Sequence, residues 1–375
     1  MKVAVAVHGR FHAFELAGQL YARRLLARLD TTYPGFAAPA RLPLRTLPWL
    51  ELIRRMWPRL HLPGSPDLFI ARAFARSLAG HLPQADILVG WSGALLEAIE
   101  PARAHGLKVV LERGSTHMSH QTEILRDAHA RFGLEWRTTD PRLIARELAE
   151  YESVDLICTG CSHARQTFLD RGIAAAKIAV NPYGVDLSRF SPGDHPRKKR
   201  ILFAGLVGLR KGIPWLLDAF RALPADWELH LVGPQEPGFA ALLHRYDMSR
   251  IILRGPLSHN ALAEEYRQAA IFCLPSIEEG FGMVILQAMA SGCAVVASTA
   301  TGGPDAGDHG RHLMLVPPAD SPALADALNI LAADESLRHR LGEAAHLRVA
   351  DDFSWNDYGE RAVTLYQMLT NPKSV

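Results

Sequence analysis

Two adjacent carboxylates stand just before an apolar helix-length run in the stretch EEGFGMVILQAMASG, residues 278 to 292. Carboxylates in this place can simply cap the helix, because its first backbone N–H groups lack partners and carry partial positive charge. The glycines on either side of Phe281 favour a second interpretation, since a backbone without side chains lets a phosphate approach the helix N-terminus. The stretch therefore predicts an anion site at Gly280 and Gly282, with capping by Glu278 and Glu279 as the alternative.

A second glycine-rich segment carries the cations that such an anion would need. The segment GLVGLRKG, from Gly205 to Gly212, includes the adjacent pair Arg210 and Lys211 and follows an expected strand. Arginine offers a fork of hydrogen bonds to phosphate oxygens, and lysine adds a compact point charge. Together with residues 278 to 292, this segment predicts a diphosphate site in one crevice at the carboxyl ends of parallel strands.

The elements that must position these residues follow from short apolar runs that alternate with helix-length segments. Such alternation is typical of a parallel sheet with helices on both faces. In the first half we expect strands at Val3–Val7, Ile87–Val89, Val109–Glu112, Leu156–Thr159 and Ile178–Asn181, and helices at Phe14–Leu29, Asp67–His81 and Pro141–Tyr151. In the second half we expect strands at Ile201–Ala204, Glu228–Val232, Ile251–Leu253, Ile271–Leu274, Ala294–Ser298 and Leu313–Val316. The helices expected between and after them are Pro214–Leu223, Phe239–Tyr246, His259–Ala269, Gly282–Ser291 and Ser321–Ala333.

The chain length and one linker-like segment predict two domains. A chain of 375 residues is too long for one ordinary core. The segment SPGDHPRKKR, residues 191 to 200, combines proline, glycine and a run of like charge, which is typical of a linker. We therefore expect an α/β protein of two doubly wound, Rossmann-like domains, residues 1–190 and 191–355, facing a central cleft. The amphipathic segment 356–375 is expected to form a helix that packs back on the first domain.

Composition narrows the class of protein. The formal net charge of +2 gives no global argument for nucleic acid as a partner. Four cysteines are too few for a disulfide framework and fit a reducing cytosol. The start MKVAVAVHGRF is too short and too soon interrupted for a signal peptide, and no apolar run of about 18 residues predicts a membrane span. We expect a cytoplasmic protein.

Several motifs in this sequence, in this order, resemble the retaining glycosyltransferases of family 4. They are Asn181-Pro-Tyr-Gly-Val-Asp186 with Phe190-Ser-Pro192, Arg210-Lys-Gly212, Pro275-Ser276 with Glu279-Gly-Phe-Gly282, and Thr301-Gly-Gly-Pro-Asp305. The similarity covers most of residues 150 to 320, and in the first half it depends mainly on Glu112-Arg-Gly-Ser-Thr-His117. The resemblance implies the GT-B fold, in which two Rossmann-like domains face a deep cleft.

The resemblance also implies roles for individual residues. Lys211 would bind the donor's diphosphate with help from Arg210, Glu279 would contact the hydroxyls of the donor sugar, and His117 would point at the transferred sugar. These four are the expected catalytic residues. The expected donor-binding residues are Gly9, Gly205, Gly280, Phe281, Gly282, Met283, Val284 and Gln287.

Two positions depart from the family pattern. Gln287 stands where the family carries a glutamate that holds the ribose, and Leu206 stands where it carries an arginine. Glutamine can hydrogen-bond a diol without the charge-assisted bond, so weaker nucleotide binding is expected. These departures motivate an alternative from another class, a non-catalytic nucleotide-sugar-binding partner or sensor of the same fold. An epimerase or phosphorylase of related fold is a third possibility, but no lysine for pyridoxal phosphate can be pointed to.

The function expected from these residues is transfer of a sugar from a nucleotide-sugar, UDP- or GDP-linked, to a glycan or lipid-linked acceptor. No Asp-x-Asp pair occurs in the sequence, and two cations with a helix N-terminus can stabilise the departing diphosphate, so neither a metal nor a cofactor is expected. In the family, retention of configuration is explained by front-face attack, with the leaving phosphate taking the acceptor's proton. A role in bacterial polysaccharide or glycolipid synthesis follows from the resemblance.

Three further features have simpler interpretations. Cys158 and Cys161 have metal-ligand spacing, but no second pair lies nearby, so packing in the core is expected. His117 and His120 lack a third ligand at matching spacing. The segment TLPWLELIRRMWPRLHLPG, residues 46 to 64, mixes tryptophan and aliphatic side chains with arginines. It predicts either packing on its own domain or peripheral contact with anionic lipid at the inner face of the membrane.

Overall fold

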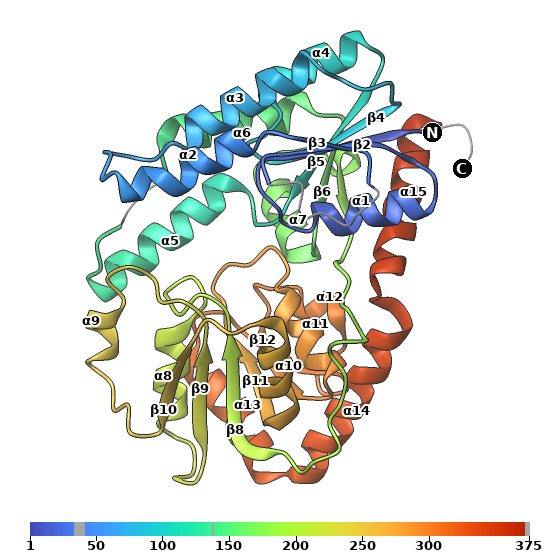
Figure 1. Ribbon diagram of the computed structural model, residues 1–375. Coiled ribbons are helices and arrows are strands. Elements are labelled where there is room, and N and C mark those ends of the chain that lie inside the picture. The colour runs from blue at the N-terminus through green and yellow to red at the C-terminus, as the bar shows by residue number, and fades with distance from the viewer. Residues whose placement is uncertain (34–41, 137–138, 372–375) are drawn as a thin grey trace.

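Two sheets of parallel strands, one in each half of the chain, organise the computed structural model (Figure 1). The structure describes residues 1–33, 42–136 and 139–371. Every strand pair recorded within these residues is parallel, and the intervening helices cover both faces of each sheet. The expected fold class, two doubly wound α/β domains, is confirmed.

The first sheet has the strand order β3-β2-β1-β4-β5-β6-β7 in the described residues. Its strands are β1 (Val3–Val7), β2 (Leu26–Thr31), β3 (Leu44–Thr46), β4 (Ile87–Trp91), β5 (Lys108–Arg113), β6 (Leu156–Thr159) and β7 (Ile178–Val180). Its helices are α1 (Ala13–Ala22), α2 (Pro48–Arg59), α3 (Asp67–Ala79), α4 (Leu96–Ala104), α5 (Met118–Phe132), α6 (Pro141–Ser153) and α7 (Ser162–Leu169).

The second sheet has the order β10-β9-β8-β11-β12-β13. Its strands are β8 (Lys198–Ala204), β9 (Glu228–Val232), β10 (Ile251–Gly255), β11 (Ala269–Leu274), β12 (Ala294–Ser298) and β13 (Met314–Val316). The helices are α8 (Ile213–Phe220), α9 (Ala240–Leu243), α10 (His259–Gln268), α11 (Met283–Ala290), α12 (Gly303–Ala306), α13 (Ser321–Ala333), α14 (Glu335–Asp352) and α15 (Trp355–Thr370).

The central strands are apolar on both faces, and this is why they lie in the middle of their sheets. Every residue of β1 (VAVAV) and of β11 (AAIFCL) is buried. Strands covered by helices on both sides have no solvent face, so they read as continuous apolar runs. The strand order reverses between β1 and β4 and between β8 and β11. In open α/β sheets, ligands bind in the crevice at such a reversal, at the carboxyl ends of the strands.

One predicted helix is wrong over its second half. The helix expected at Phe14–Leu29 ends at Ala22, and residues 26 to 31 instead form β2 beside β1. Arg24 has a φ of +59°, a left-handed conformation that breaks the helix and turns the chain into the strand. The spacing of apolar residues in this segment does not distinguish a helix from a strand, because Leu26 and Leu29 are buried in the strand as they would be in a helix.

Smaller differences concern helix extent. The helix expected at Phe239–Tyr246 is only the single turn α9, Ala240–Leu243. Strand β3 and helices α4, α5, α7, α12 and α14 were not among the expected elements. In α5 and α14, histidines, arginines and acidic residues interrupt the apolar pattern.

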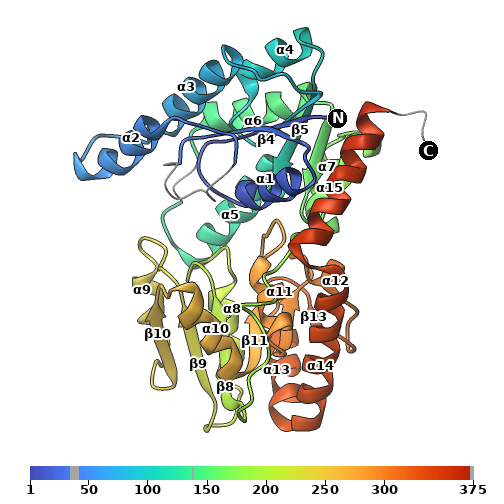
Figure 2. The same ribbon diagram turned by 45° about the vertical axis from the view of Figure 1, so that its right-hand side comes forward.

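The last two helices connect the domains. Helix α14 packs beside α11 of the second domain, and α15 continues the chain upward to pack against α1 of the first (Figures 1 and 2). In the α1–α15 contact, a side chain at Gly359 would lie 2.7 Å from Cβ of Gln19, which shows how closely the helices approach. A capping box between Ser354 and Asp357 starts α15 at the point where the chain leaves the second domain.

Candidate active site

The stretch 278–292 lies where the sequence analysis expected it, at the carboxyl end of β11. The chain leaves the strand at Leu274 and enters α11 at Met283, with Gly282 as the N-cap residue at a φ of +83°. A side chain at Gly282 would lie 2.7 Å from Cδ2 of Leu274, so the close turn requires glycine. No side chain caps α11, so the capping interpretation of the two glutamates is wrong. The Ile285 N–H donates to the Gly282 carbonyl oxygen at 2.8 Å, whereas the N–H groups of Met283 and Val284 precede the first acceptors of the helix.

The two cations of the glycine-rich loop face the two glutamates. The ammonium group of Lys211 forms an ion pair with Oε2 of Glu279. The Arg210 guanidinium lies 2.6 Å from Oε2 of Glu278 and 3.6 Å from Oε1 of Glu279. The two cations and the two glutamates thus meet between β8 and β11, at the reversal of strand order.

Glu278 is not a free ligand, because the first domain holds it. Its Oε1 accepts hydrogen bonds from the Thr116 backbone N–H at 3.0 Å and from the Thr116 hydroxyl at 2.7 Å. Its Oε2 accepts a hydrogen bond from the Gln121 amide at 3.0 Å. Burial alone would raise the pKa of Glu278, but Arg210 and these hydrogen bonds outweigh it and hold the pKa at about 2. The buried carboxylate is therefore ionised at neutral pH.

His117 follows directly on that contact. It is the N-cap residue of α5, and its Nδ1 accepts a hydrogen bond from the Ser119 N–H at 3.2 Å. This bond assigns the proton of the neutral ring to Nε2. Burial, together with the charges of Arg171 and Arg113, lowers the pKa of His117 to about 4. At neutral pH, His117 is thus a neutral imidazole that can donate one hydrogen bond from Nε2.

The glycine-rich turn of the second domain touches the backbone of the first. A Cβ at Gly280 would lie 2.1 Å from the Gly114 carbonyl oxygen, so this position has no room for a side chain. The Phe281 ring is buried and packs on Tyr183, with ring centroids 5.5 Å apart. Phe281 therefore anchors the turn by its side chain, and only its backbone N–H remains as a ligand for a donor.

Gln287 is held within the second domain and lines a pocket. Its Oε1 accepts a hydrogen bond from the Tyr266 hydroxyl at 3.2 Å, which leaves its NH₂ group to donate. Gln287 and Met283 line a pocket of about 530 Å³. Arg10 of the first domain, His259 at the start of α10, the connecting segment 184–187 and Trp355 of α15 also line it. Both domains and both connections between them thus contribute to this pocket.

The remaining predicted donor-binding residues lie along the same edges. Gly9 follows β1 with a φ of +135°, one residue before Arg10 in the pocket wall. Gly205 follows β8 with a φ of +149°. Val284 sits in the first turn of α11, where its carbonyl oxygen accepts a hydrogen bond from the Tyr266 hydroxyl at 3.4 Å.

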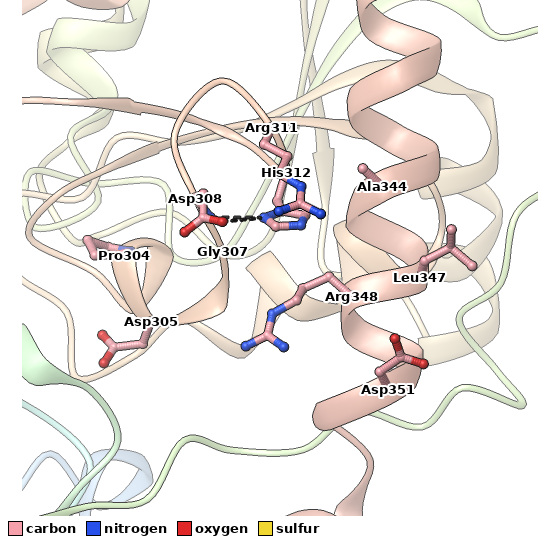
Figure 3. Close-up of a pocket in the computed structure, with 10 residues that line it drawn as sticks. All are labelled: Pro304, Asp305, Gly307, Asp308, Arg311, His312, Ala344, Leu347, Arg348 and Asp351. Atoms are coloured by element: carbon pink, nitrogen blue, oxygen red, sulfur yellow. Dashed lines mark hydrogen bonds and ion pairs between the residues drawn. The ribbon is translucent and has the colours of Figure 1, made fainter.

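A second pocket of about 530 Å³ lies on the second domain between the α12 region and α14 (Figure 3). Asp308 and His312 pair within it, and Arg348 projects from α14. At its edge, Asp305 accepts hydrogen bonds from the Ser162 N–H at 3.0 Å and the Ser162 hydroxyl at 2.5 Å. None of the predicted catalytic or donor-binding residues lines this pocket.

The cysteines and histidines form no metal centre in the part of the chain that the structure describes. No group of three or more His, Cys, Asp or Glu side chains there could hold a metal ion. Cys158 and Cys161 are buried, and burial raises the pKa of each thiol. Packing of Cys158 and Cys161 in the core is confirmed.

Sequence reasoning missed the residues that shape the loop before His117. Arg113 donates a hydrogen bond from Nε to the Thr116 carbonyl oxygen at 3.0 Å and pairs with Glu147 at 2.6 Å. The Ser92 hydroxyl also donates to Glu147, at 2.6 Å. Glu147 lies 34 residues from Arg113, so no local pattern joins them. Thr116 lies inside the motif Glu112-Arg-Gly-Ser-Thr-His117, and its hydroxyl next to His117 is the one signal for this contact in the sequence.

Comparison with known proteins bears on this arrangement. Residues 198–334 match the family model described as glycosyl transferases group 1. A curated relative, MMP alpha-(1->4)-mannosyltransferase of Mycolicibacterium hassiacum, is 31% identical over 60% of this chain and 55% of its own length. D-inositol 3-phosphate glycosyltransferase of Kribbella flavida is 30% identical over 61% of each chain. The chain thus spans little more than half the length of the curated relatives it matches.

Solved structures share the architecture over the whole chain. Sucrose-phosphate synthase from Thermosynechococcus elongatus superposes with a TM-score of 0.70 at 20% identity and covers 100% of both chains. HepE from Anabaena, solved in complex with UDP, gives a TM-score of 0.70 at 16% identity over 98% of this chain and 100% of its own. The chain has the GT-B fold, and its second domain matches the model of the glycosyl transferases group 1 over residues 198–334.

Proposed function

We propose that this protein is a metal-independent, retaining glycosyltransferase that moves a sugar from a nucleotide-sugar to a glycan or lipid-linked acceptor. The observation that carries the proposal is the meeting of Lys211, Arg210, Glu279 and the N-terminus of α11 at the carboxyl edge of the second sheet. The names of curated relatives support sugar transfer, and the UDP and UDP-glucose bound to HepE support a nucleotide-sugar donor.

The nucleotide would occupy the pocket lined by Met283, Gln287 and Arg10. Its diphosphate would then reach the free N–H groups of α11 and the ammonium group of Lys211. Breaking the sugar–phosphate bond leaves extra negative charge on the diphosphate and positive charge on the sugar. Cations and N–H dipoles already aimed at the departing charge lower the barrier, and one such donor typically contributes about 2.7–4 kcal/mol.

The sugar would lie between Glu279 and His117. Glu279 accepts hydrogen bonds from sugar hydroxyls, and the Nε2–H of neutral His117 donates one. Opposite hydrogen-bonding roles on two sides fix the orientation of a polyol ring. No side chain of this group is assigned as a general base. In front-face transfer the departing phosphate oxygen takes the proton of the acceptor hydroxyl.

The acceptor side would be the first domain, and helix α2 favours an acceptor in a lipid surface. Trp49 and Leu52 of α2 are 46% and 60% exposed, and Leu60 just after the helix is 59% exposed. Arg55 and Arg59 project from the same helix. Of the two interpretations of segment 46–64, the exposed apolar side chains support peripheral contact with an anionic membrane. No helix among the described residues is long and apolar enough to cross a membrane.

A panel of UDP, GDP, ADP and their sugar conjugates tests the donor site by thermal stabilisation. A ligand at about 100 times its Kd stabilises the folded state by roughly 2.7 kcal/mol, so binding is readily measured. We expect stabilisation by one base, and loss of it in Lys211→Ala. Transfer is then assayed with the responding donor and membrane extracts as acceptor, in the presence and absence of EDTA. The anomeric configuration of the product is read by NMR.

The outcomes separate the two candidate functions. Stabilisation with release of nucleoside diphosphate in EDTA, and a product of retained configuration, is the result expected of the transferase. Stabilisation without turnover on any acceptor would favour the nucleotide-sugar sensor. That alternative is suggested by Gln287 and by Leu206, which is 37% exposed. No stabilisation by any nucleotide would overturn the donor site itself.

A further inference from the structure

The geometry points to Glu278 as an interdomain latch, a positioning residue that holds the two domains closed and fixes Arg210 beside the donor site. This inference rests on the proposed function for the meaning of the closed state, and the contact itself is independent of it. Glu278 belongs to the second domain, yet three of its four hydrogen-bond or ion-pair donors come from the first. Its side chain is 0% exposed, so it cannot reach a donor in the cleft.

The bonds of Glu278 use both of its oxygens. Oε1 accepts hydrogen bonds from the backbone N–H and the hydroxyl of Thr116. Oε2 accepts a hydrogen bond from the Gln121 amide and lies 2.6 Å from Nε of Arg210. A buried carboxylate that loses such partners is strongly destabilised, because its charge is then neither solvated nor paired. Separation of the domains would strip the Thr116 and Gln121 donors from Glu278. The closed arrangement is thus favoured wherever Glu278 is ionised.

The latch also orients the catalytic cation. Arg210 Nη2 donates a hydrogen bond to the Ser115 hydroxyl of the first domain at 2.9 Å, while its Nε faces Glu278. Glu278 and Ser115 therefore hold the guanidinium from two sides, one in each domain. Because Thr116 precedes His117 directly, the same contact fixes the start of the segment that carries His117. One carboxylate thus couples closure to the assembly of the site.

Other contacts between the domains surround Glu278 and agree with this assignment. The Cys161 thiol donates to the Gly280 carbonyl oxygen at 3.0 Å, and Ser162 binds Asp305. On the opposite side of the interface, His129 of α5 lies 3.3 Å from Glu236. Of these interdomain groups, Glu278 is the one carboxylate in the described residues that also contacts a predicted catalytic cation, Arg210.

The interdomain distance can be measured with two spin labels. All four native cysteines are buried, so labels attach selectively to cysteines introduced at exposed sites. Glu100 on α4 and His339 on α14 have side chains that are 79% and 81% exposed and lie in different domains. Pulsed electron spin resonance on Glu100→Cys, His339→Cys protein then reports how closed the molecule is.

The variants isolate the latch from general destabilisation. Glu278→Gln removes the carboxylate on the second domain, and Thr116→Val removes the hydroxyl on the first domain that donates to it. Thr116→Ser keeps this hydroxyl and is the conservative control. Glu265→Gln is a matched control, since Glu265 is buried and paired with Arg200 at 3.1 Å inside the second domain. We expect a broadened distribution shifted to longer distances in Glu278→Gln and Thr116→Val. We expect the native distribution in Thr116→Ser and Glu265→Gln. Circular dichroism verifies that each variant is folded.

A kinetic measurement separates positioning from simple support of the fold. With the responding donor, Glu278→Gln should lower kcat about tenfold or more and change the donor KM less than about threefold. The reason is that Lys211 and Gln287, which would hold the nucleotide, stay in place. Thr116→Ser should restore kcat relative to Thr116→Val.

Two results would overturn the latch. One is an unchanged distance distribution in both Glu278→Gln and Thr116→Val, and the other is an unchanged kcat in variants that open. Failure of the proposed function is distinguishable from either. A distance that depends on Glu278 in a protein that binds no nucleotide would keep the latch and reject the transferase.

Discussion

Lys211 and Glu279 form an ion pair across the mouth of α11, between the loop after β8 and the loop after β11. This ion pair would have to break when a donor binds. A diphosphate competes with Glu279 for the ammonium group of Lys211, and the sugar hydroxyls need the carboxylate of Glu279. On the proposed function, the pair would neutralise the site before the donor arrives, and donor binding would free both partners together.

Replacement of Glu279 by glutamine should separate nucleotide affinity from transfer. Without the competing carboxylate, Lys211 is available to the diphosphate, so free UDP or GDP should bind about threefold to tenfold more tightly. Transfer should fall by roughly a hundredfold, because a charge-assisted hydrogen bond to the sugar is lost from the transition state. Isothermal titration and a donor turnover assay measure the two quantities.

The control for this change is Glu236→Gln. Glu236 accepts a hydrogen bond from the Leu209 N–H at 2.8 Å in the same glycine-rich loop, without contacting Lys211. It should leave the affinity for the free nucleotide within about twofold. Equal or weaker UDP binding in Glu279→Gln would show that the pair does not compete with the phosphate.

Gln287→Glu should strengthen nucleotide binding. Gln287 sits in the pocket wall, with its carbonyl oxygen bound to the Tyr266 hydroxyl. A carboxylate could keep the Tyr266 bond and accept a ribose hydroxyl with its second oxygen, as a charge-assisted hydrogen bond. We expect a Kd about threefold to tenfold lower for the nucleoside diphosphate. The 2′-deoxynucleotide and the 2′,3′-dideoxynucleotide provide the controls, and an equal gain for both would place residue 287 away from the ribose hydroxyls.

Much of this fold could be predicted because the central strands are apolar on both faces. The runs at Val3–Val7 and Ile271–Leu274 have no competing interpretation once helices separate them, although β11 begins two residues earlier, at Ala269. Strand β2 could not be predicted in this way. Leu26 and Leu29 are three residues apart, a spacing that also fits the helix before them, and the left-handed turn at Arg24 leaves no mark in the sequence.

The site shows the same division. Residues close in sequence, such as Arg210 with Lys211 and Glu278 with Glu279, could be paired by their position after parallel strands. The role of Glu278 could not, because its partners lie 157 and 162 residues away in the other domain. An adjacent pair of glutamates reads as one feature in the sequence. In the structure one is turned to the first domain and the other to Lys211.

Helix α2 should carry the protein to anionic membranes. The double variant Trp49→Ser, Leu52→Ser should bind vesicles of phosphatidylglycerol about tenfold more weakly than the native chain. The reason is that two large apolar side chains are no longer transferred from water into the membrane interface. Binding to phosphatidylcholine should be weak for both and should not respond to salt. Co-sedimentation at two salt concentrations measures this.

A matched control exists on the opposite domain. Ile330 on α13 and Leu347 on α14 are 50% and 57% exposed, so Ile330→Ser, Leu347→Ser removes a similar apolar surface. This variant should bind anionic vesicles like the native protein. An equal loss in both double variants would mean that α2 is not the contact.

Stability should fall with pH between about 6.5 and 4 because of His8. Burial and the nearby Arg54 guanidinium lower the pKa of His8 to about 4, against 6.5 in the unfolded chain, although Glu147 and Asp67 oppose this. In that window the unfolded chain binds more protons than the folded one. The free energy of unfolding therefore decreases as the pH falls, by up to about 1.4 kcal/mol per pH unit for this group.

His8→Gln should flatten this dependence, and His339→Gln should not, because the His339 side chain is 81% exposed. Urea unfolding at pH 7.5, 6.5, 5.5 and 4.5, followed by circular dichroism, gives the slope for each protein. His117, whose pKa is also about 4, leaves a residual slope of the same sign in His8→Gln. The native slope persisting unchanged in His8→Gln would show that His8 is not buried as a neutral ring. Its place beside Arg54 in the first domain would then need to be revised.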